Sequence, residues 1–203
     1  VEPLVEIRFV ILDDLKVDTV AINGDRIRGD RNAPIAIIEY SDYECPFCAR
    51  YVSNTYPQID KEYVQTGRVK YVFRDLPLAF HRSAFKAAEA SHCAGEQGKF
   101  WEMHDRMFEN NKALAPADLV SHGNALGLDA VKLKQCLDSG QYADAIRQDV
   151  TQANGWGISG TPTFLIGVSD PDSSIVKVKT KVVGARPFAD FKAALDSLVA
   201  TPQ

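Results

Sequence analysis

The stretch "IAIIEYSDYECPFCAR", residues 35–50, joins an apolar run to two cysteines that stand three positions apart. A short apolar run rich in β-branched residues is typical of a buried strand, so residues 35–38 predict one. Pro46 suits the first turn of a helix, because its fixed φ fits that turn and its missing N–H is not needed there. Cys45 and Cys48 are therefore expected where a strand passes into a helix.

The sequence on either side predicts a mixed α/β chain. Residues 46–67 form a helix with a kink at Pro57, and alternating apolar side chains in residues 69–73 indicate a second strand. From about residue 80 to residue 155 the pattern is wholly helical. Strands return in "TPTFLIGV" (161–168) and "IVKVKTKVV" (175–183), with a turn in "SDPDSS" (169–174) and a last helix over 188–200.

Lysines alternate with apolar residues along the strand at 175–183. Lys177, Lys179 and Lys181 share one face, while Val176, Val178 and their neighbours face the other way. Charge along one face suits an exposed strand at the edge of a sheet, where it discourages pairing with other chains. We therefore expect this strand at the sheet edge.

The spacing of the two cysteines is typical of a redox centre. The unpaired N–H groups at a helix start favour negative charge, so the pKa of Cys45 should fall and its thiolate should attack a disulfide. Cys48, one turn on, would close on Cys45 and release the partner. Half a zinc site and a purely structural bridge are the alternatives. Zinc needs four ligands, and the chain has no second CxxC and no histidines at ligand spacing. A bridge across so short a loop constrains little.

Residues outside the motif also bear on this chemistry. Glu39 ends the apolar strand, where it is either a buried acid that takes the Cys48 proton or an ordinary acid facing water. Glu44 would oppose thiolate formation if its charge pointed at Cys45. Pro162 begins a strand, and a cis bond after Thr161 would free Thr161 backbone groups to pair with an extended substrate.

The two remaining cysteines both fall in the helical region. Cys93 and Cys136 are either a pair that closes a loop of roughly 44 residues or two buried free thiols. Because neighbouring helices can bring the two cysteines into contact, the disulfide is the favoured prediction.

Composition excludes several classes of protein. The 203 residues are 45% apolar with a net charge of −4, which argues against nucleic acid as a partner. No run of 18 apolar residues could span a bilayer, and the first 18 residues do not form a signal peptide, so any such peptide is absent from this chain.

Five stretches together resemble the DsbA-like thiol–disulfide oxidoreductases of the thioredoxin superfamily, over roughly residues 29–200. They are "IIEYSDYECPFC", "FRDLPL", "CAGEQGKFWEMHDRMF", "GLDAVKLKQCLDSG" and "GISGTPTFLIG". The resemblance implies a thioredoxin fold with an inserted all-helical domain. The domains would be an N-terminal extension (1–28), a thioredoxin-like domain (29–78 and 156–203) and the helical insertion (79–155).

The resemblance also implies roles for single residues. Cys45 would be the exposed nucleophile, Cys48 its buried partner and Glu39 the buried acid, with no metal or cofactor. Pro162 would be a cis-proline that binds substrate together with Thr161 and Phe47. Cys93 and Cys136 would form the second, structural disulfide of some members.

The expected function is an oxidase, a monomer in the bacterial periplasm or outside the cell. It would pass its disulfide to exported polypeptides that are reduced or wrongly oxidised, and a membrane redox partner would recycle it. The alternatives are an isomerase or reductase on the same fold, or a peptide-binding chaperone. Phe47 stands where the best-known oxidase has histidine, and Thr161 before Pro162 also occurs in isomerases. No clear dimerisation domain precedes residue 29, which ranks the isomerase second.

Overall fold

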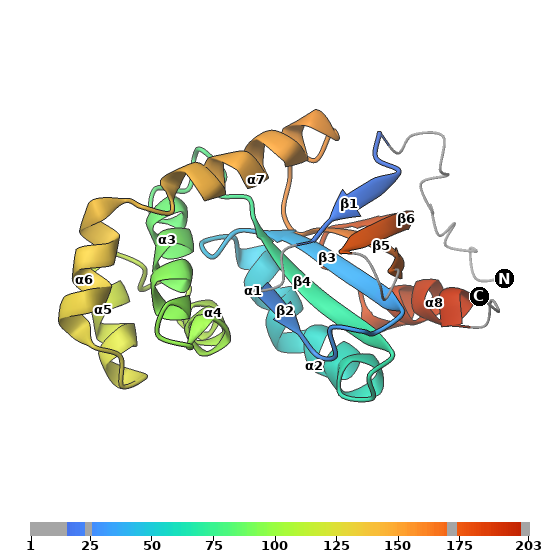
Figure 1. Cartoon of the computed structure of the whole chain (residues 1–203), viewed down its shortest axis with the longest axis horizontal. Coiled ribbons are helices and arrows are strands. Elements are labelled where there is room, and N and C mark those ends of the chain that lie inside the picture. Colours follow the sequence, from blue (N-terminus) through green and yellow to red (C-terminus); the bar gives the residue numbers. More distant parts are fainter. Residues whose placement is uncertain (1–15, 23–25, 170–173, 200–203) are drawn as a thin grey trace, which may run out of the picture.

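A six-stranded sheet forms the centre of the computed structural model, which describes residues 16–22, 26–169 and 174–199 (Figure 1). The strand order is β1-β6-β5-β3-β4-β2. The strands are β1 (Thr19–Ala21), β2 (Ile27–Arg28), β3 (Ile35–Ser41), β4 (Val69–Asp75), β5 (Thr163–Ser169) and β6 (Ile175–Val183). β3 and β4 run parallel, whereas β5 is antiparallel to both of its neighbours.

Helices cover both faces of this sheet. One face packs on α1 (Pro46–Asn54), α2 (Tyr56–Ile59), the π-helical turns η3 (Asp60–Val64) and α8 (Phe188–Val199). The other face packs on the end of α7 (Ala143–Gly155). Every residue of β3 is buried, because side chains alternate between two covered faces. This explains why the strand reads as a continuous apolar run with a single acid, Glu39.

Five helices lie between β4 and β5, as the sequence predicts. They are α3 (Ala84–Gly95), α4 (Phe100–Glu109), α5 (Pro116–Ala125), α6 (Ala130–Ser139) and α7. Local signals set their ends: the Asp129 side chain accepts from the N–H groups of Val131 and Lys132 at the start of α6, and Gly140 ends it with φ 64°. The predicted α/β class with a helical insertion is confirmed.

Pro57 interrupts the helix that follows the cysteines, as predicted. α1 ends at Asn54 and α2 begins at Tyr56, so the break lies just before the proline. Pro57 has no N–H to donate to the preceding turn. The final helix ends in the structure at Val199, and most of the predicted turn at 169–174 lies outside the described residues.

The prediction that β6 forms the sheet edge is wrong for its first part. β1 pairs antiparallel with residues 175–177 of β6, and β2 pairs with β4 at the opposite edge. Both added strands come from residues 1–28, the predicted N-terminal extension. They are two and three residues long, too short for alternation to reveal them. The division into domains stays a prediction.

A buried cluster of ion pairs ties these parts together. Asp149, on α7, accepts from Arg26 over 2.6 Å and from Arg74 of β4 over 2.9 Å. Asp75, at the end of β4, lies 2.8 Å from the His92 ring of α3 and 3.4 Å from Arg26. Buried charges are tolerated when they are paired, as these are. The cluster fixes the helical region against the end of the sheet that carries the cysteines.

Candidate active site

Cys45 and Cys48 lie at the junction of β3 and α1, as predicted. Cys45 is the N-cap residue of α1, and Pro46 takes the first helical position. Cys48 follows one turn later and is fully buried. The resemblance implies an exposed Cys45, and this is wrong: only 3% of the residue is accessible. Part of its cover is the segment at Thr161, whose carbonyl oxygen lies 3.6 Å from the Cys45 sulfur.

The surroundings of Cys45 favour its thiolate. A hydrogen bond from the Cys48 thiol lowers the pKa of Cys45 to about 5, with further help from Thr161 and from the N–H groups of Phe47 and Cys48. Burial acts in the opposite direction and is outweighed. The N–H donors are the free ones of the first helical turn, which have no partner inside the helix. At neutral pH Cys45 is therefore almost wholly a thiolate, the form that attacks disulfides.

Cys48 has the opposite character. Burial raises the pKa of Cys48 well above its ordinary value, and the neighbouring charges of Cys45 and Glu39 raise it further. The pair is therefore split into one sulfur that is ionised and one that keeps its proton. Such a split separates an attacking thiolate from a resolving thiol that needs a base before it can react.

Glu39 is buried, and so the water-facing alternative is wrong. It lies on the central strand, between Phe73 of β4 and Phe164 of β5, with none of its surface accessible. Burial raises the pKa of Glu39 to about 7, although the Tyr71 hydrogen bond and Ser41 act against this rise. A carboxyl with this pKa can both take and return a proton near neutral pH. Its charge also reaches Cys48, whose pKa it raises.

The Thr161–Pro162 peptide bond is cis and precedes β5. It brings Thr161 against Cys45 from a segment 116 residues away in the chain. The Pro162 carbonyl oxygen accepts from the Gly184 N–H over 2.8 Å, which fixes this segment to the end of β6. Two distant stretches of the sequence thus meet at one sulfur.

Phe47 and Glu44 flank the cysteines in different ways. Phe47 is 53% exposed, and the Arg50 guanidinium lies 5.2 Å from its ring centre. Glu44 does not oppose the thiolate, because its carboxylate accepts from the N–H of Ser83, 2.7 Å away, just before α3. The negative charge of Glu44 instead lies at the start of α3, where the helix dipole makes a negative group favourable.

Comparison with known proteins now decides the family. The thioredoxin family model matches residues 22–180, which include both cysteines, Glu39 and the cis-proline. The chain belongs to the thioredoxin family. Within it, the structure is similar to crystal structures of DsbA proteins. This DsbA-like protein carries the split cysteine pair that a dithiol–disulfide oxidoreductase, as predicted from the sequence, would use.

Two solved structures illustrate the likeness. Wolbachia pipientis alpha-DsbA1 is 29% identical with a TM-score of 0.75, and the match covers 87% of this chain and 92% of that one. Pseudomonas aeruginosa DsbA2 is 28% identical with a TM-score of 0.65, over 86% and 93% of the two chains.

Curated relatives of similar sequence carry a different name. A Na⁺/H⁺ antiporter NhaA 3 of Salinispora tropica is 41% identical over 143 residues, which are 70% of this chain and 21% of that protein. The chain thus spans about a fifth of the length of the curated relatives that it matches. In the part of the DsbA-like chain that the structure describes, no helix is long and apolar enough to cross a membrane.

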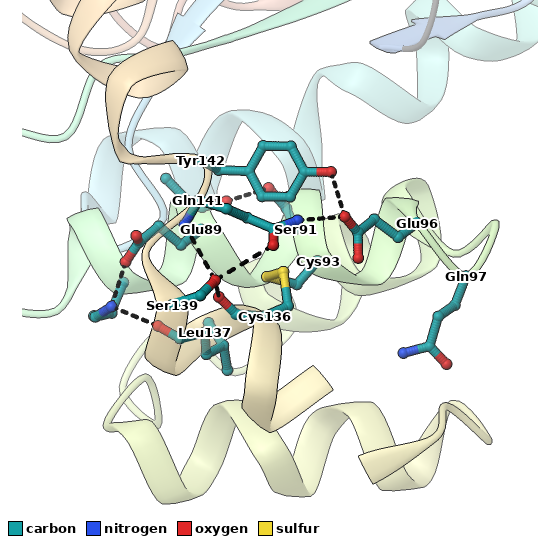
Figure 2. The surroundings of a disulfide bond; sticks show 12 residues. Glu89, Ser91, Cys93, Glu96, Gln97, Cys136, Leu137, Ser139, Gln141 and Tyr142 are labelled. Atoms are coloured by element: carbon teal, nitrogen blue, oxygen red, sulfur yellow. Dashed lines mark hydrogen bonds and ion pairs between the residues drawn. A yellow bond between two sulfur atoms is a disulfide. The ribbon is translucent and has the colours of Figure 1, made fainter. Parts of the chain in front are cut away.

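The other two cysteines are bonded to each other at a separate place. The Cys93 and Cys136 sulfurs are 1.99 Å apart and join α3 to α6 inside the helical region. Figure 2 shows the bond between these helices, with the Tyr142 hydroxyl close by, donating to Glu96 over 2.9 Å. Both cysteines are buried. This bond is placed to stabilise the helical region, whereas Cys45 and Cys48 are free thiols.

Sequence reasoning missed a second exposed aromatic near the cysteines. Phe80 is 75% exposed and packs edge-on against His81, with ring centres 4.5 Å apart. His81 lies 2.8 Å from the Asp42 carboxylate, which also accepts from the N–H groups of Glu44 and Leu78. Asp42 therefore fastens the loop that carries Phe80 to the turn before Cys45. These contacts join residues about 36 to 39 positions apart, so no local pattern could have revealed them.

Proposed function

We propose that the DsbA-like protein is an oxidase that donates its Cys45–Cys48 disulfide to the thiols of exported polypeptides. A substrate thiolate attacks the Cys45 sulfur, the Cys45–Cys48 bond breaks, and Cys48 leaves with a proton from Glu39. A second thiolate of the same substrate then attacks the first substrate sulfur in the mixed disulfide. The substrate disulfide forms, and Cys45 is released as a thiolate. The substrate loses two electrons and the cysteine pair gains them.

The observation that carries the proposal is the low pKa of Cys45, about 5. Lowering the pKa of the attacking thiol stabilises the reduced pair, and a stabilised reduced pair makes the disulfide a stronger oxidant. Cys45 is also the better leaving group, because a thiolate of low pKa departs faster from a mixed disulfide. Both effects favour transfer of the Cys45–Cys48 disulfide to a substrate.

Two exposed aromatic side chains in segments linked to the Cys45 turn support a polypeptide as the substrate. Phe47 follows Cys45 on α1, and Phe80 lies on the loop that Asp42 fastens beside it. Exposed large apolar side chains that gather in one area mark binding surfaces. An extended chain could contact both rings while its cysteine meets Cys45 and its backbone lies along Thr161.

Transfer to a reduced, unfolded polypeptide tests this proposal. The oxidised protein should remove two polypeptide thiols for each Cys45–Cys48 disulfide that is reduced. Phe80→Ala should slow this reaction about tenfold, since it removes one exposed phenyl ring worth roughly 1–2 kcal/mol, and should leave the reaction with glutathione unchanged. Val131→Ala, which alters an exposed apolar residue on α6, is the control. Equal loss on both substrates, or no transfer, would contradict the proposal.

The partners and the location follow from the proposed chemistry. An oxidase must be reoxidised after each transfer, so we propose a membrane redox partner that takes the two electrons. Disulfide donation is useful only where disulfides persist, which for a bacterial protein means the periplasm or the cell exterior. The match covers 21% of the named antiporter, so antiport activity is no part of the proposal.

An isomerase or reductase is the second candidate. The cis Thr161–Pro162 segment against Cys45 is compatible with it. The side chain of Phe47, a phenyl ring, offers the thiolate neither a charge nor an N–H. Reshuffling of a wrongly bonded polypeptide faster than oxidation of a reduced one would favour this candidate. A chaperone role is the third, and holdase activity that survives loss of both Cys45 and Cys48 would support it.

A further inference from the structure

Glu39 is held by one of its two oxygens. The Tyr71 hydroxyl, on β4, donates to Oε2 over 2.5 Å, whereas Oε1 has no hydrogen-bond partner in the described part of the chain. Both residues are buried. A buried carboxylate oxygen without a donor is costly to keep ionised. Oε1 is therefore the atom at which Glu39 takes up a proton most readily.

Tyr71 is held in turn from the helix that carries the cysteines. Its hydroxyl oxygen lies 3.2 Å from that of Tyr51, which is also fully buried. Tyr51 follows Cys48 by three residues on α1, so the two side chains lie on the same face of the helix. A chain of two hydroxyls thus connects α1 to Glu39, alongside the cysteine whose proton must move.

We propose that Tyr71 is a positioning residue for Glu39: it fixes Oε2 and leaves Oε1 to exchange a proton with the Cys48 thiol. The inference rests on the proposed acid–base role of Glu39. When a mixed disulfide at Cys45 is resolved, the Cys48 thiol gives its proton to Oε1 and the Cys48 thiolate attacks the Cys45 sulfur. The bond to the partner breaks, and the partner leaves as a thiolate. Tyr71 keeps its proton throughout, since burial raises its pKa well above the ordinary value.

Several other groups act on Glu39 from the elements around it. They are Arg28 on β2, Ser41 on β3, Tyr43 and Cys45 in the turn that follows, and Cys48 and Tyr51 on α1. Arg28 and Ser41 lower the pKa of Glu39, while Cys45 raises it. The Tyr71 hydroxyl donates directly to a Glu39 oxygen, and this bond lowers the pKa of Glu39 more than the Ser41 side chain does. Removing the Tyr71 hydroxyl is therefore the most direct change to test.

The test follows the resolution of a mixed disulfide between Cys45 and glutathione as a function of pH. Tyr71→Phe keeps the ring, which packs against Tyr56 with centres 4.7 Å apart, and removes the donor to the ionised carboxylate. The pKa of Glu39 should rise, so the midpoint of the rate profile should move up by about one pH unit or more. Tyr51→Phe removes the outer hydroxyl and leaves Tyr71 in place. It should move the midpoint upward by less.

Glu39→Gln separates this inference from the proposed function. It should remove the midpoint altogether, and adding Tyr71→Phe to it should change the profile no further. If Glu39→Gln leaves the profile unchanged, the proposed role of Glu39 is wrong and the inference falls with it. A second result is that Glu39→Gln removes the midpoint, while Tyr71→Phe and Tyr51→Phe leave the midpoint in place and lower only the melting temperature. The two tyrosines would then be merely structural. That result would overturn the inference and leave the function standing.

Discussion

Replacing Cys45 with serine is expected to lower the rate of thiol–disulfide exchange at least about 1000-fold, to the level of the uncatalysed reaction. The Cys45 sulfur is the atom that substrates attack and the thiolate that is later released. A serine hydroxyl forms neither a disulfide nor, near neutral pH, an anion. Its pKa lies far above that of Cys45, which is about 5. The measurement is the rate of oxidation of a reduced polypeptide by the protein.

Cys48→Ser is the matched control, because it removes the other sulfur of the same pair. The Cys45 thiolate still attacks, but no thiol follows to resolve the mixed disulfide. Covalent complexes between Cys45 and substrate should therefore accumulate and be visible on a non-reducing gel. Full activity in Cys45→Ser, or complexes that form through Cys48 instead, would show that the roles of the two cysteines are assigned wrongly.

Loss of the Cys93–Cys136 bond should lower the free energy of unfolding by about 2–4 kcal/mol. The bond spans a sequence separation of 43 residues, and the chain-entropy model gives about 4 kcal/mol for a loop of that length. Its two ends lie on α3 and α6, so the bond limits how far the helical region can open. Denaturant unfolding of the Cys93→Ala/Cys136→Ala protein measures the effect.

The same protein should keep its exchange activity where it is still folded, because it retains both free cysteines, Cys45 and Cys48. Cys45→Ala/Cys48→Ala is the control, since it removes as many cysteines and opens no long loop. This control should lose less stability and all activity. An unchanged unfolding free energy in the Cys93→Ala/Cys136→Ala protein would show that the bond adds no stability.

The reactive pair could be predicted from the sequence because its signals are local. Spacing alone puts Cys45 and Cys48 one helical turn apart, and Pro46 marks where the helix begins. Glu39 shares a face with Ile35 and Ile37, but whether that face is covered depends on α1 and α8. The sequence alone therefore does not decide whether Glu39 is a buried acid or an exposed one.

The partners of these residues could not be predicted, because distant parts of the chain supply them. Tyr71 reaches Glu39 only through the register in which β3 and β4 pair, which places Ile37 opposite Tyr71. Glu44 turns away from Cys45 because the N–H of Ser83, 39 residues on, is a better partner. Part of the cover over Cys45 comes from Thr161, and no periodicity near the cysteines could indicate it.

The central claim is that the Cys45 environment makes the Cys45–Cys48 disulfide oxidising. A pKa of about 5 leaves Cys45 almost wholly ionised at neutral pH, whereas the thiol of thioredoxin, with a pKa near 7, is about half ionised. The difference stabilises the reduced pair by roughly 2 kcal/mol, which corresponds to about 50 mV for a two-electron couple.

The most direct test is the reduction potential of the Cys45–Cys48 pair, measured by equilibration with reduced and oxidised glutathione. Thioredoxin lies near −270 mV, so we expect a value of about −220 mV or less negative. That result would place the pair on the oxidising side of thioredoxin. A value near −270 mV or below would contradict the account and favour a reductase.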